Sequence, residues 1–314
     1  GLVPQLGASA DDQRQYASFF AAMESYKHRK GTDGKRAFAI PVAYSSADAT
    51  LRALDAITMA DYMAQQGWNS APLRWYVDYC LRDDYGAGSS VISAWAGIHY
   101  FAARDGRAAN ADPQAVVTWP EGNGWIVKQL RARLKGMIKT GQLVYQAAAE
   151  AGGQASITSL DLQSEKSTGY RAQALILAVP HFIAARLLPQ TQTDAPFIYS
   201  PWLVANITLD AMPQGKGERR AWDNVIYDSP MLGYVVATHQ NLNRYQRDTV
   251  LTYYWPLDHL PPAQARQEAI ARSHAAWQQL ILNELYRIHP ELIGHVLRLD
   301  VWLWGHGMIR PVPG

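Results

Sequence analysis

The 314-residue sequence predicts an α+β fold. Residues 11–103 carry apolar side chains at helical spacing, which is typical of a group of packed helices. After about residue 105, short runs rich in β-branched and aromatic residues alternate with turns, and such runs favour strands. A long helical pattern returns at residues 263–288. Helices and strands that occupy separate stretches of the chain are typical of the α+β class.

The first third of the chain is expected to be helical. Tyr16, Phe19 and Met23 recur at the spacing of one helix face, and Gly67 follows a helical stretch as a stop signal. The expected helices span residues 11–27, 46–57, 58–66, 71–82 and 91–103.

The middle of the chain is expected to mix strands and helices. Residues 174–179 are apolar at almost every position, so the strand expected at 170–179 should be buried on both faces, and Pro180 should end it. The other expected strands are 116–119, 143–147 and 156–162, and the expected helices are 125–134 and 181–188.

A second β-rich section follows. The strand candidates are residues 202–209, 225–227, 232–239 and 250–255, then one long helix at 263–288 and a final strand at 296–304. Residues 305–314 are rich in Gly and Pro and are expected to form an irregular tail.

Composition excludes several classes of protein. A net charge of +2 with 48% apolar residues argues against disorder and against nucleic-acid binding. The single cysteine, Cys80, excludes an intramolecular disulfide framework and a multi-cysteine metal site. No apolar run reaches the ~20 residues of a membrane-spanning helix. The 11 Trp and 17 Tyr favour an aromatic-lined cavity or an aromatic-rich core.

Familiar catalytic motifs are absent from the sequence. It has no phosphate-binding G-x-x-x-x-G-K-[ST], no G-x-S-x-G and no pair of His at i, i+4 that would hold zinc on a helix. Residues 86–88 read Gly-Ala-Gly, but they lie between two expected helices, whereas a dinucleotide fingerprint follows a strand. No catalytic acid, base or nucleophile and no metal-ligand set stands out.

Three separated segments, taken in order, carry the main functional signal, and the second of them has two parts joined by a hairpin. They are WPEGNG (119–124) before a helix, LVY (143–145) with AVP (178–180) at the end of the apolar run after the hairpin, and WLWGHGM (302–308) before a final Pro-Gly. In this order and spacing they resemble the flavin-containing amine oxidase superfamily, which includes monoamine and polyamine oxidases, protoporphyrinogen oxidase and phytoene desaturase.

The resemblance implies a fold and a cofactor, FAD. It implies a helical cap and a mixed-sheet substrate domain, interleaved with part of an FAD-binding α/β domain. Residues 1–115 and 191–299 would form the substrate domain, and residues 116–190 and 300–314 would belong to the FAD-binding domain. By the same resemblance, the cofactor would contact Leu143, Val144, Ala178, Pro180, Gly305 and His306.

The chain departs from the family pattern at both ends. The family begins with a strand, G-x-G-x-x-G and a ribose-binding Glu, and it ends with a Gly-rich segment that closes over the flavin. Neither is found in this sequence. The resemblance therefore predicts the central portion of such an enzyme.

The function that the resemblance implies is FAD-dependent oxidation of a small molecule, an amine or another hydrophobic compound. Hydride would pass from a substrate C–H bond, such as one alpha to an amine, to flavin N5. Candidates for the substrate pocket are His239, at the end of an apolar strand, and the strand aromatics Tyr254 and Trp304. Each of the three also has a plain structural interpretation, as a satisfied strand-end His or as core and sheet aromatics.

Two other classes of function stay open. A non-catalytic module could hold a ligand in an aromatic cleft, and an interaction subunit could complete a flavin site only with a partner chain. Retention of flavin by the chain itself would separate the oxidoreductase from the module. The sequence leaves open the substrate, the electron acceptor, the oligomeric state and the compartment, cytoplasm or periplasm.

Overall fold

The structure is a computed structural model that describes residues 3–104, 109–110, 119–188, 197–214, 221–241 and 247–314. The chain divides into two compact units. The first unit is Gly1–Val116 with Ile198–Gly314, and the second unit is Val117–Phe197.

The helical part of the first unit is built on well-capped helices. Ser9 and Thr58 each form a capping box with an Asp three residues later, and Ser70 and Ser93 also accept hydrogen bonds from the first turns of their helices. The helices are α1 (Ala10–His28), α2 (Ala49–Arg52), α3 (Met59–Gln65), α4 (Ala71–Tyr85) and α5 (Ala94–Ala102), with 3-10 turns η1 (Val42–Tyr44) and η2 (Ala53–Ala56).

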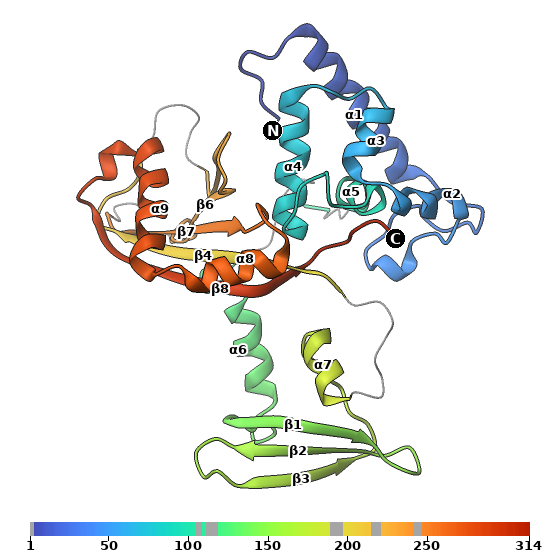
Figure 1. Cartoon of the computed structure of the whole chain (residues 1–314), viewed down its shortest axis with the longest axis vertical. Coiled ribbons are helices and arrows are strands. Elements are labelled where there is room, and N and C mark those ends of the chain that lie inside the picture. Colours follow the sequence, from blue (N-terminus) through green and yellow to red (C-terminus); the bar gives the residue numbers. More distant parts are fainter. Residues whose placement is uncertain (1–2, 105–108, 111–118, 189–196, 215–220, 242–246) are drawn as a thin grey trace. The chain divides into compact units, whose positions relative to one another are not determined.

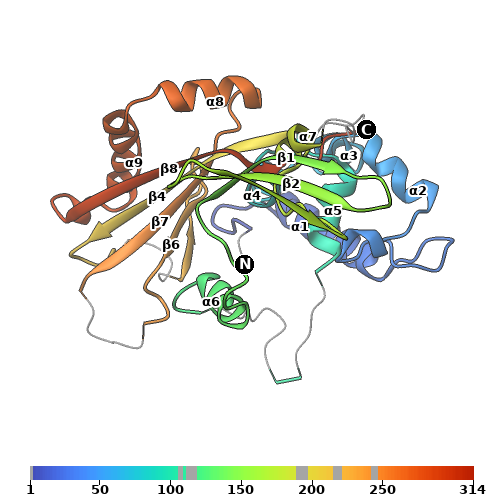
Figure 2. The ribbon, with the colours of Figure 1, turned by 90° about the horizontal axis from the view of Figure 1, so that it is seen from below.

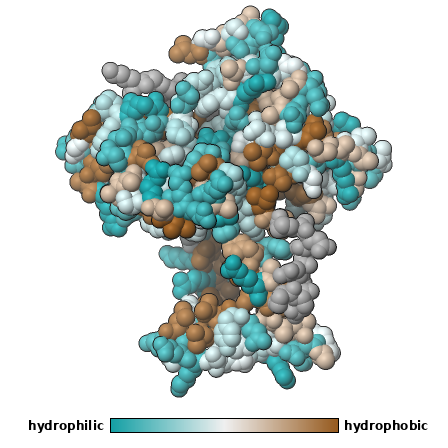
Figure 3. Space-filling model, viewed as in Figure 1, coloured by the Kyte–Doolittle hydropathy of each residue, from teal (hydrophilic) through white to brown (hydrophobic). Residues whose placement is uncertain are grey.

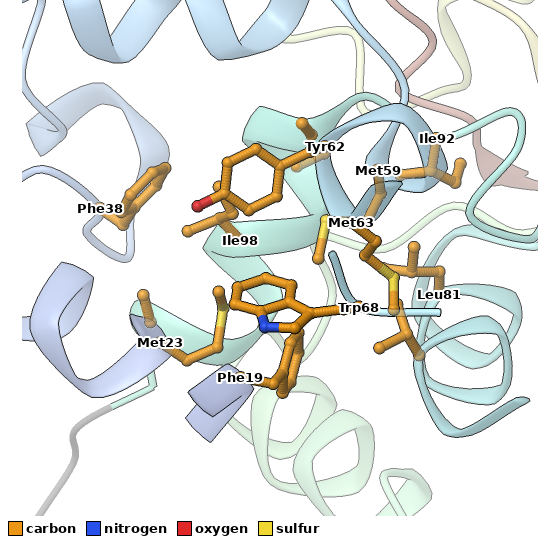
Figure 4. Close-up of a cluster of buried hydrophobic side chains, with 14 of the residues drawn as sticks. Phe19, Met23, Phe38, Met59, Tyr62, Met63, Trp68, Leu81, Ile92 and Ile98 are labelled. Atoms are coloured by element: carbon orange, nitrogen blue, oxygen red, sulfur yellow. The ribbon is translucent and has the colours of Figure 1, made fainter. Parts of the chain in front are cut away.

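These helices share one apolar core. Phe19 is fully buried and makes edge-to-face contacts with Trp68 and Phe101. Met63 and Tyr62 of α3 lie in the same core, as Figure 4 shows. The helices expected at 11–27, 58–66, 71–82 and 91–103 are therefore present, because their apolar faces pack on one another. The helix expected at 46–57 is divided into α2 and η2.

The rest of the first unit is a five-stranded sheet in the order β5-β6-β7-β4-β8. Helices α8 and α9 cover one face of it, and their residues Ala265, Trp277 and Ile281 share a core with Leu203 and Ile207 of β4 (Figures 1 and 2). The elements are β4 (Tyr199–Leu209), β5 (Asp223–Val225), β6 (Gly233–Val236), β7 (Thr249–Pro256), α8 (Pro262–Ala271), α9 (His274–Ile288), η4 (Pro290–Leu292) and β8 (Val296–Ile309).

Three expectations for this section are wrong. The sheet is not mixed, because every strand pair in the described residues is antiparallel. The helix expected at 263–288 breaks at Arg272, whose backbone is extended, and restarts with Ser273 as the N-cap of α9. The tail expected to begin at residue 305 is strand up to Ile309, because β4 pairs with it as far as Tyr199. The strand expected at 225–227 lies two residues earlier, as β5, and the strand expected at 232–239 is the shorter β6.

The second unit holds a three-stranded antiparallel sheet in the order β1-β2-β3 and two helices. Its elements are α6 (Gly124–Arg133), β1 (Gln142–Ala149), β2 (Ala155–Asp161), β3 (Ser167–Ala172) and α7 (His181–Leu187), and α7 packs against β1. Residues 116–118 of the strand expected at 116–119 lie outside the described residues.

The buried strand expected at 170–179 is also wrong. Strand β3 ends at Ala172, and Ile176 is 90% exposed. An apolar run forms a strand buried on both faces only where neighbouring strands and covering layers surround it. No strand of the described chain pairs with residues 174–179.

The four-segment domain division stays a prediction. Residues 300–314 lie in the same compact unit as the five-stranded sheet, because β8 is one continuous strand of that sheet. Among the described helices, none combines the length and apolar character needed to cross a membrane.

Candidate functional site

Aromatic and acidic side chains gather where α4 packs on the five-stranded sheet. Tyr79 of α4 packs with Trp202 of β4 and with Tyr254 of β7. The Tyr254 hydroxyl donates a hydrogen bond to Asp223 Oδ1 on β5, at 2.5 Å. Asp83 of α4 lies near enough to Asp223 that the negative charge of Asp223 helps to raise the pKa of Asp83. These five residues are called the α4–sheet cluster below.

Helical spacing places the α4 residues of this cluster. Trp75, Tyr79 and Asp83 are four residues apart, so they share one face of the helix. Trp75 stacks on Tyr79 at 5.9 Å between ring centroids and meets Tyr227 at 4.6 Å. One face of α4 therefore carries the rings of Trp75 and Tyr79 and the carboxyl group of Asp83.

Two glycines let the backbone approach Trp202 closely. Gly86 ends α4 in the left-handed conformation, and a Cβ there would lie 2.5 Å from Ser200 Cβ and 2.7 Å from Trp202 Nε1. A Cβ on Gly307 would lie 2.9 Å from Trp202 Cδ1. The indole N–H of Trp202 is buried and finds no hydrogen-bond partner in the described part of the chain.

Two arginines fix α4 to the sheet region. Arg82 pairs with Asp258, which follows β7, at 2.9 Å between Nε and Oδ2, and both side chains are only 18% exposed. Buried Arg310, just after β8, donates from Nε to Ser200 Oγ at 2.8 Å and from Nη2 to the Gly86 carbonyl. The position of Tyr79 and Asp83 is thus set at the C-terminal end of α4 by charged hydrogen bonds as well as by packing.

The electrostatics of the α4–sheet cluster favour neutral groups. Burial, together with the nearby negative charges of Asp84 and Asp223, raises the pKa of Asp83 to about 6. Burial also raises the pKa of Asp223, although the hydrogen bond from Tyr254 acts in the opposite direction. Burial raises the pKa of both Tyr79 and Tyr254, so these phenols remain hydrogen-bond donors at neutral pH.

The sheet face next to this cluster is lined with exposed aromatic rings. Tyr254 pairs with Val204, which pairs with Trp302, so all three side chains point to one face. Trp302 is 45% and Trp304 is 58% exposed. The opposite face is the one that α8 and α9 cover. The sheet therefore presents a partly open aromatic surface beside the α4–sheet cluster.

A surface groove of about 330 Å³ runs along α4 next to this cluster and shares Trp75 with that helix face. Trp75, Asp78 and Arg82 of α4 line it, together with Asp228 and Asp258. Asp78 is already bonded to the Ser89 amide and Asp258 to Arg82. The carboxylates of this groove thus mainly hold the loop after α4 and the turn after β7.

The predicted adenine-side residues lie in the second unit. Leu143 is 52% exposed and Val144 is half-buried on β1, at the edge of the three-stranded sheet. Pro180 is the N-cap residue of α7, and Ala178 is exposed just before it. Because α7 packs against β1, Pro180 at the start of α7 and residues 143–144 on β1 belong to two elements that contact each other within that unit.

The other predicted residues lie in the first unit. The Gly305 carbonyl accepts a hydrogen bond from Arg266 Nη1 at 3.3 Å. His306 is exposed and meets the Tyr199 ring edge-on at 5.8 Å. His239 lies just beyond β6, where its Nδ1 donates to the Val236 carbonyl and its ring lies 5.6 Å from that of Trp222.

Of the predicted pocket residues, Tyr254 and Trp304 share a sheet face. His239 lies on the turn after β6, where it contacts its own turn and the ring of Trp222. Sequence reasoning missed Tyr79, Asp83 and Asp223. A signal for the first two existed: their spacing by four residues puts a Tyr and an Asp on an otherwise apolar helix face. Nothing local marks Asp223, because the sheet alone brings it to Tyr254.

Comparison with known proteins shows which solved structures this fold resembles. No protein-family model and no curated protein matches the sequence. Among solved structures, wild-type putrescine oxidase bound to putrescine matches with a TM-score of 0.64 at 12% identity, over 94% of this chain and 62% of that chain. Cyclohexylamine oxidase from Brevibacterium oxydans matches with a TM-score of 0.58 at 11% identity, over 96% of this chain and 64% of that chain.

An oxidoreductase from Methanosarcina mazei matches with a TM-score of 0.56 at 12% identity, over 97% of this chain and 64% of that chain. The chain has an amine-oxidase-like fold. It spans less than two thirds of the length of these three structures, between 62% and 64%. The amine-oxidase-like fold thus covers both compact units of the chain.

Proposed function

We propose that this chain forms the substrate-binding part, and a portion of the cofactor-binding part, of an FAD-dependent oxidoreductase of the amine-oxidase type. The observation that carries the proposal is the likeness of fold to two amine oxidases over 94% and 96% of this chain. Three sequence segments that resemble the flavin-containing amine oxidases, in the family's order, support it independently.

The residues present fit an FAD contact. In the described chain β1 pairs only with β2, so one row of its backbone N–H and C=O groups is left without a strand partner. The ladder is irregular between Val144 and Gln146, which exposes further backbone. Such backbone groups pair readily with a purine edge, so Leu143 and Val144 are the residues that would hold the adenine. When bound, FAD supplies a two-electron acceptor.

The chain's own residues would bind and orient the substrate. Trp302, Trp304 and Tyr254 offer an aromatic surface, which binds apolar groups by burial and cationic groups through ring faces. Tyr79 and Tyr254 stay neutral because burial raises the pKa of both, so they can donate hydrogen bonds to a substrate heteroatom. Packing of α4 on the sheet keeps the Tyr79 side chain out of bulk water.

The first experiment is FAD retention by the full chain. The purified chain is mixed with excess FAD, passed through a size-exclusion column, and the flavin absorption of the protein peak is recorded. Bound flavin is then tested for anaerobic bleaching by two probe amines, putrescine and cyclohexylamine. We expect retained flavin that at least one probe reduces.

Two further outcomes would contradict the proposal. If no flavin is retained, but a probe amine quenches the tryptophan fluorescence in wild type and not in Trp304→Ala, the chain is a ligand-binding module. If flavin is retained only after a partner chain is added, the chain is a subunit that completes a shared site. Leu297→Ala, on the same strand and 62% exposed, serves as the matched control.

A further inference from the structure

A short apolar segment is exposed on the helical part of the first unit. Residues 40–44, called the apolar tip below, read Ile-Pro-Val-Ala-Tyr, and all five are exposed. Ile40 is 61%, Val42 is 57% and Tyr44 is 68% exposed. Among the described residues up to 104, five large apolar side chains are exposed, and three of them lie in this tip. Apolar side chains that gather on the surface in this way mark an interaction site, whereas scattered single ones do not.

The backbone on either side of the tip is held in place. The Ser46 amide donates to the Arg36 carbonyl at 2.7 Å, and the Ala39 amide donates to Ser45 Oγ at 2.9 Å. These bonds tie the two ends of the tip together. Phe38, two residues before the tip, is fully buried in the core of the helices (Figure 4). The tip is therefore preformed, and it loses little backbone freedom when it binds.

Positive charge lies at the base of the tip. Arg29, Lys30 and Lys35, called the basic rim below, are exposed. The Arg29 carbonyl accepts a hydrogen bond from the Ala37 amide at 2.8 Å, and Lys30 pairs with Arg36 in an isolated antiparallel bridge. The basic rim thus lies beside the chain that leads into the tip.

Nearby carboxylates leave this positive charge uncompensated. Residues 24–52 contain six Lys or Arg but only three Asp or Glu. Asp33 and Asp48 accept hydrogen bonds from backbone amides of the same loop, and Glu24 pairs within its own helix. No ion pair to the basic rim is found in the part of the chain that the structure describes. The rim is therefore open to a negatively charged surface.

We propose that the apolar tip and the basic rim dock the protein on a membrane surface that contains anionic lipids. Ile40 and Val42 enter the boundary between headgroups and acyl chains, and Tyr44 suits this boundary because its ring is apolar and its hydroxyl is polar. The basic rim meets the negative headgroups. The proposal does not depend on the proposed function, because none of these residues is assigned to flavin or substrate.

An acidic protein is the other partner that a basic surface attracts. Such a partner would have to offer an apolar pocket that matches the shape of the tip. The boundary of a bilayer, in contrast, accepts apolar side chains of any shape. Three exposed apolar side chains on a tied loop, with the positive charge at its base, therefore favour the lipid surface.

The test measures binding of the full chain to vesicles by flotation. One set of vesicles is phosphatidylcholine with about 30% phosphatidylserine, and the other set is phosphatidylcholine alone. We expect binding to the anionic vesicles and at least about 10-fold weaker binding to the neutral ones. About 0.5 M NaCl should weaken the binding strongly, because salt screens exposed charges. A chain that does not bind the anionic vesicles would overturn the proposal.

A variant of the tip tests the apolar contribution. Val42→Ser combined with Tyr44→Ser should weaken binding to the anionic vesicles by at least about 10-fold, because less apolar surface leaves water. Leu6→Ser is the matched control, since Leu6 is 102% exposed and lies outside the tip. It should bind like wild type. Urea unfolding should be alike in all three proteins, because the changed side chains are exposed. Equal binding of the tip variant and wild type would show that the tip stays out of the membrane, and the proposal would be wrong.

A variant of the rim tests the charge. Lys30→Gln combined with Lys35→Gln should weaken binding about 25-fold, or about fivefold for each charge removed near an anionic surface. Arg74→Gln, an exposed charge on α4, should bind like wild type. Soluble poly-glutamate is tested beside the vesicles. If the chain binds poly-glutamate and not the anionic vesicles, the rim serves an acidic protein, and docking on lipid is overturned.

Discussion

At the scale of single residues, the position of Asp83 shows how the packing of α4 changes ordinary chemistry. An Asp in water ionises well below neutral pH, but here burial and the charges of Asp84 and Asp223 oppose ionisation. Between about pH 4 and pH 6, the folded chain therefore holds a proton on Asp83 that the unfolded chain would release. Folding and ionisation of this group are linked.

The first prediction concerns stability against pH. Because the pKa of Asp83 is raised to about 6 in the folded state, its ionisation destabilises the fold as pH rises through the range from about 4 to 6. Asp83→Asn should therefore raise the free energy of unfolding at pH 8 by about 2 kcal/mol, and the difference should shrink towards zero at pH 4. Urea denaturation at both pH values measures this. As a control, Asp11→Asn, at an exposed carboxyl on α1, should change the free energy of unfolding by the same small amount at both pH values. A loss of stability in Asp83→Asn at pH 8 would contradict the prediction.

The second prediction concerns Gly86. Both Gly86 and Gly67 have left-handed backbones, with φ of 67° and 73°. A Cβ on Gly67 meets nothing within 4 Å, whereas a Cβ on Gly86 collides with Ser200. Gly67→Ala should cost about 1–2 kcal/mol of stability through the backbone alone. Gly86→Ala should cost at least about 2 kcal/mol more and should disturb the fluorescence of Trp202. Equal costs would mean that α4 can move away from β4.

At the scale of elements, local signals decide where helices begin and tertiary packing decides how long strands run. Ser273 accepts a hydrogen bond from the Ala276 amide and starts α9, although the apolar pattern runs on from α8. Residues 305–309 look like a tail in the sequence, but they are strand because β4 offers partners as far as Tyr199. The start of a helix is decided by the N-cap residue and the backbone amides next to it, whereas the length of a strand depends on how far the neighbouring strand offers hydrogen-bond partners.

The third prediction tests the cap of α9. Ser273→Ala should lower the free energy of unfolding by about 1 kcal/mol, because the Ala276 amide loses its acceptor. Ser273→Asn should retain nearly full stability, since Asn caps as well as Ser. Thermal or urea unfolding of the three proteins measures the difference. If Ala and Asn variants unfold alike, α8 and α9 do not depend on this cap.

At the scale of the whole molecule, the two units differ in their cores. The first unit holds two large apolar cores, one among helices α1 to α5 and one between the sheet and helices α8 and α9. Among the described residues of the second unit, only Ala147 and Ser159 are buried. Exposed apolar side chains lie on α6, β1 and the segment before α7, and Figure 3 shows apolar surface over the three-stranded sheet.

The fourth prediction follows from this difference. Local opening costs little where few apolar contacts are broken, so amides of β1, β2 and β3 should exchange with deuterium faster than those of β4 and β7, by on the order of 100-fold. Hydrogen-exchange mass spectrometry of the full chain measures both sets at once. In FAD-loaded protein, protection of β1 should rise if Leu143 and Val144 hold the cofactor. Equal protection in both sheets without FAD would contradict the prediction.

The sequence alone determined four of the five helices expected in the first third, because their apolar spacing, Ser and Thr caps and stop glycines act over a few residues. Its ordered segments also led to the amine-oxidase-like fold. Only the tertiary structure decided that 174–179 is not a buried strand, since no strand of the described chain pairs with these residues. Only the tertiary structure places Asp223 next to Tyr254 and α4. Contacts between distant segments depend on strand register and helix packing, which no local pattern encodes.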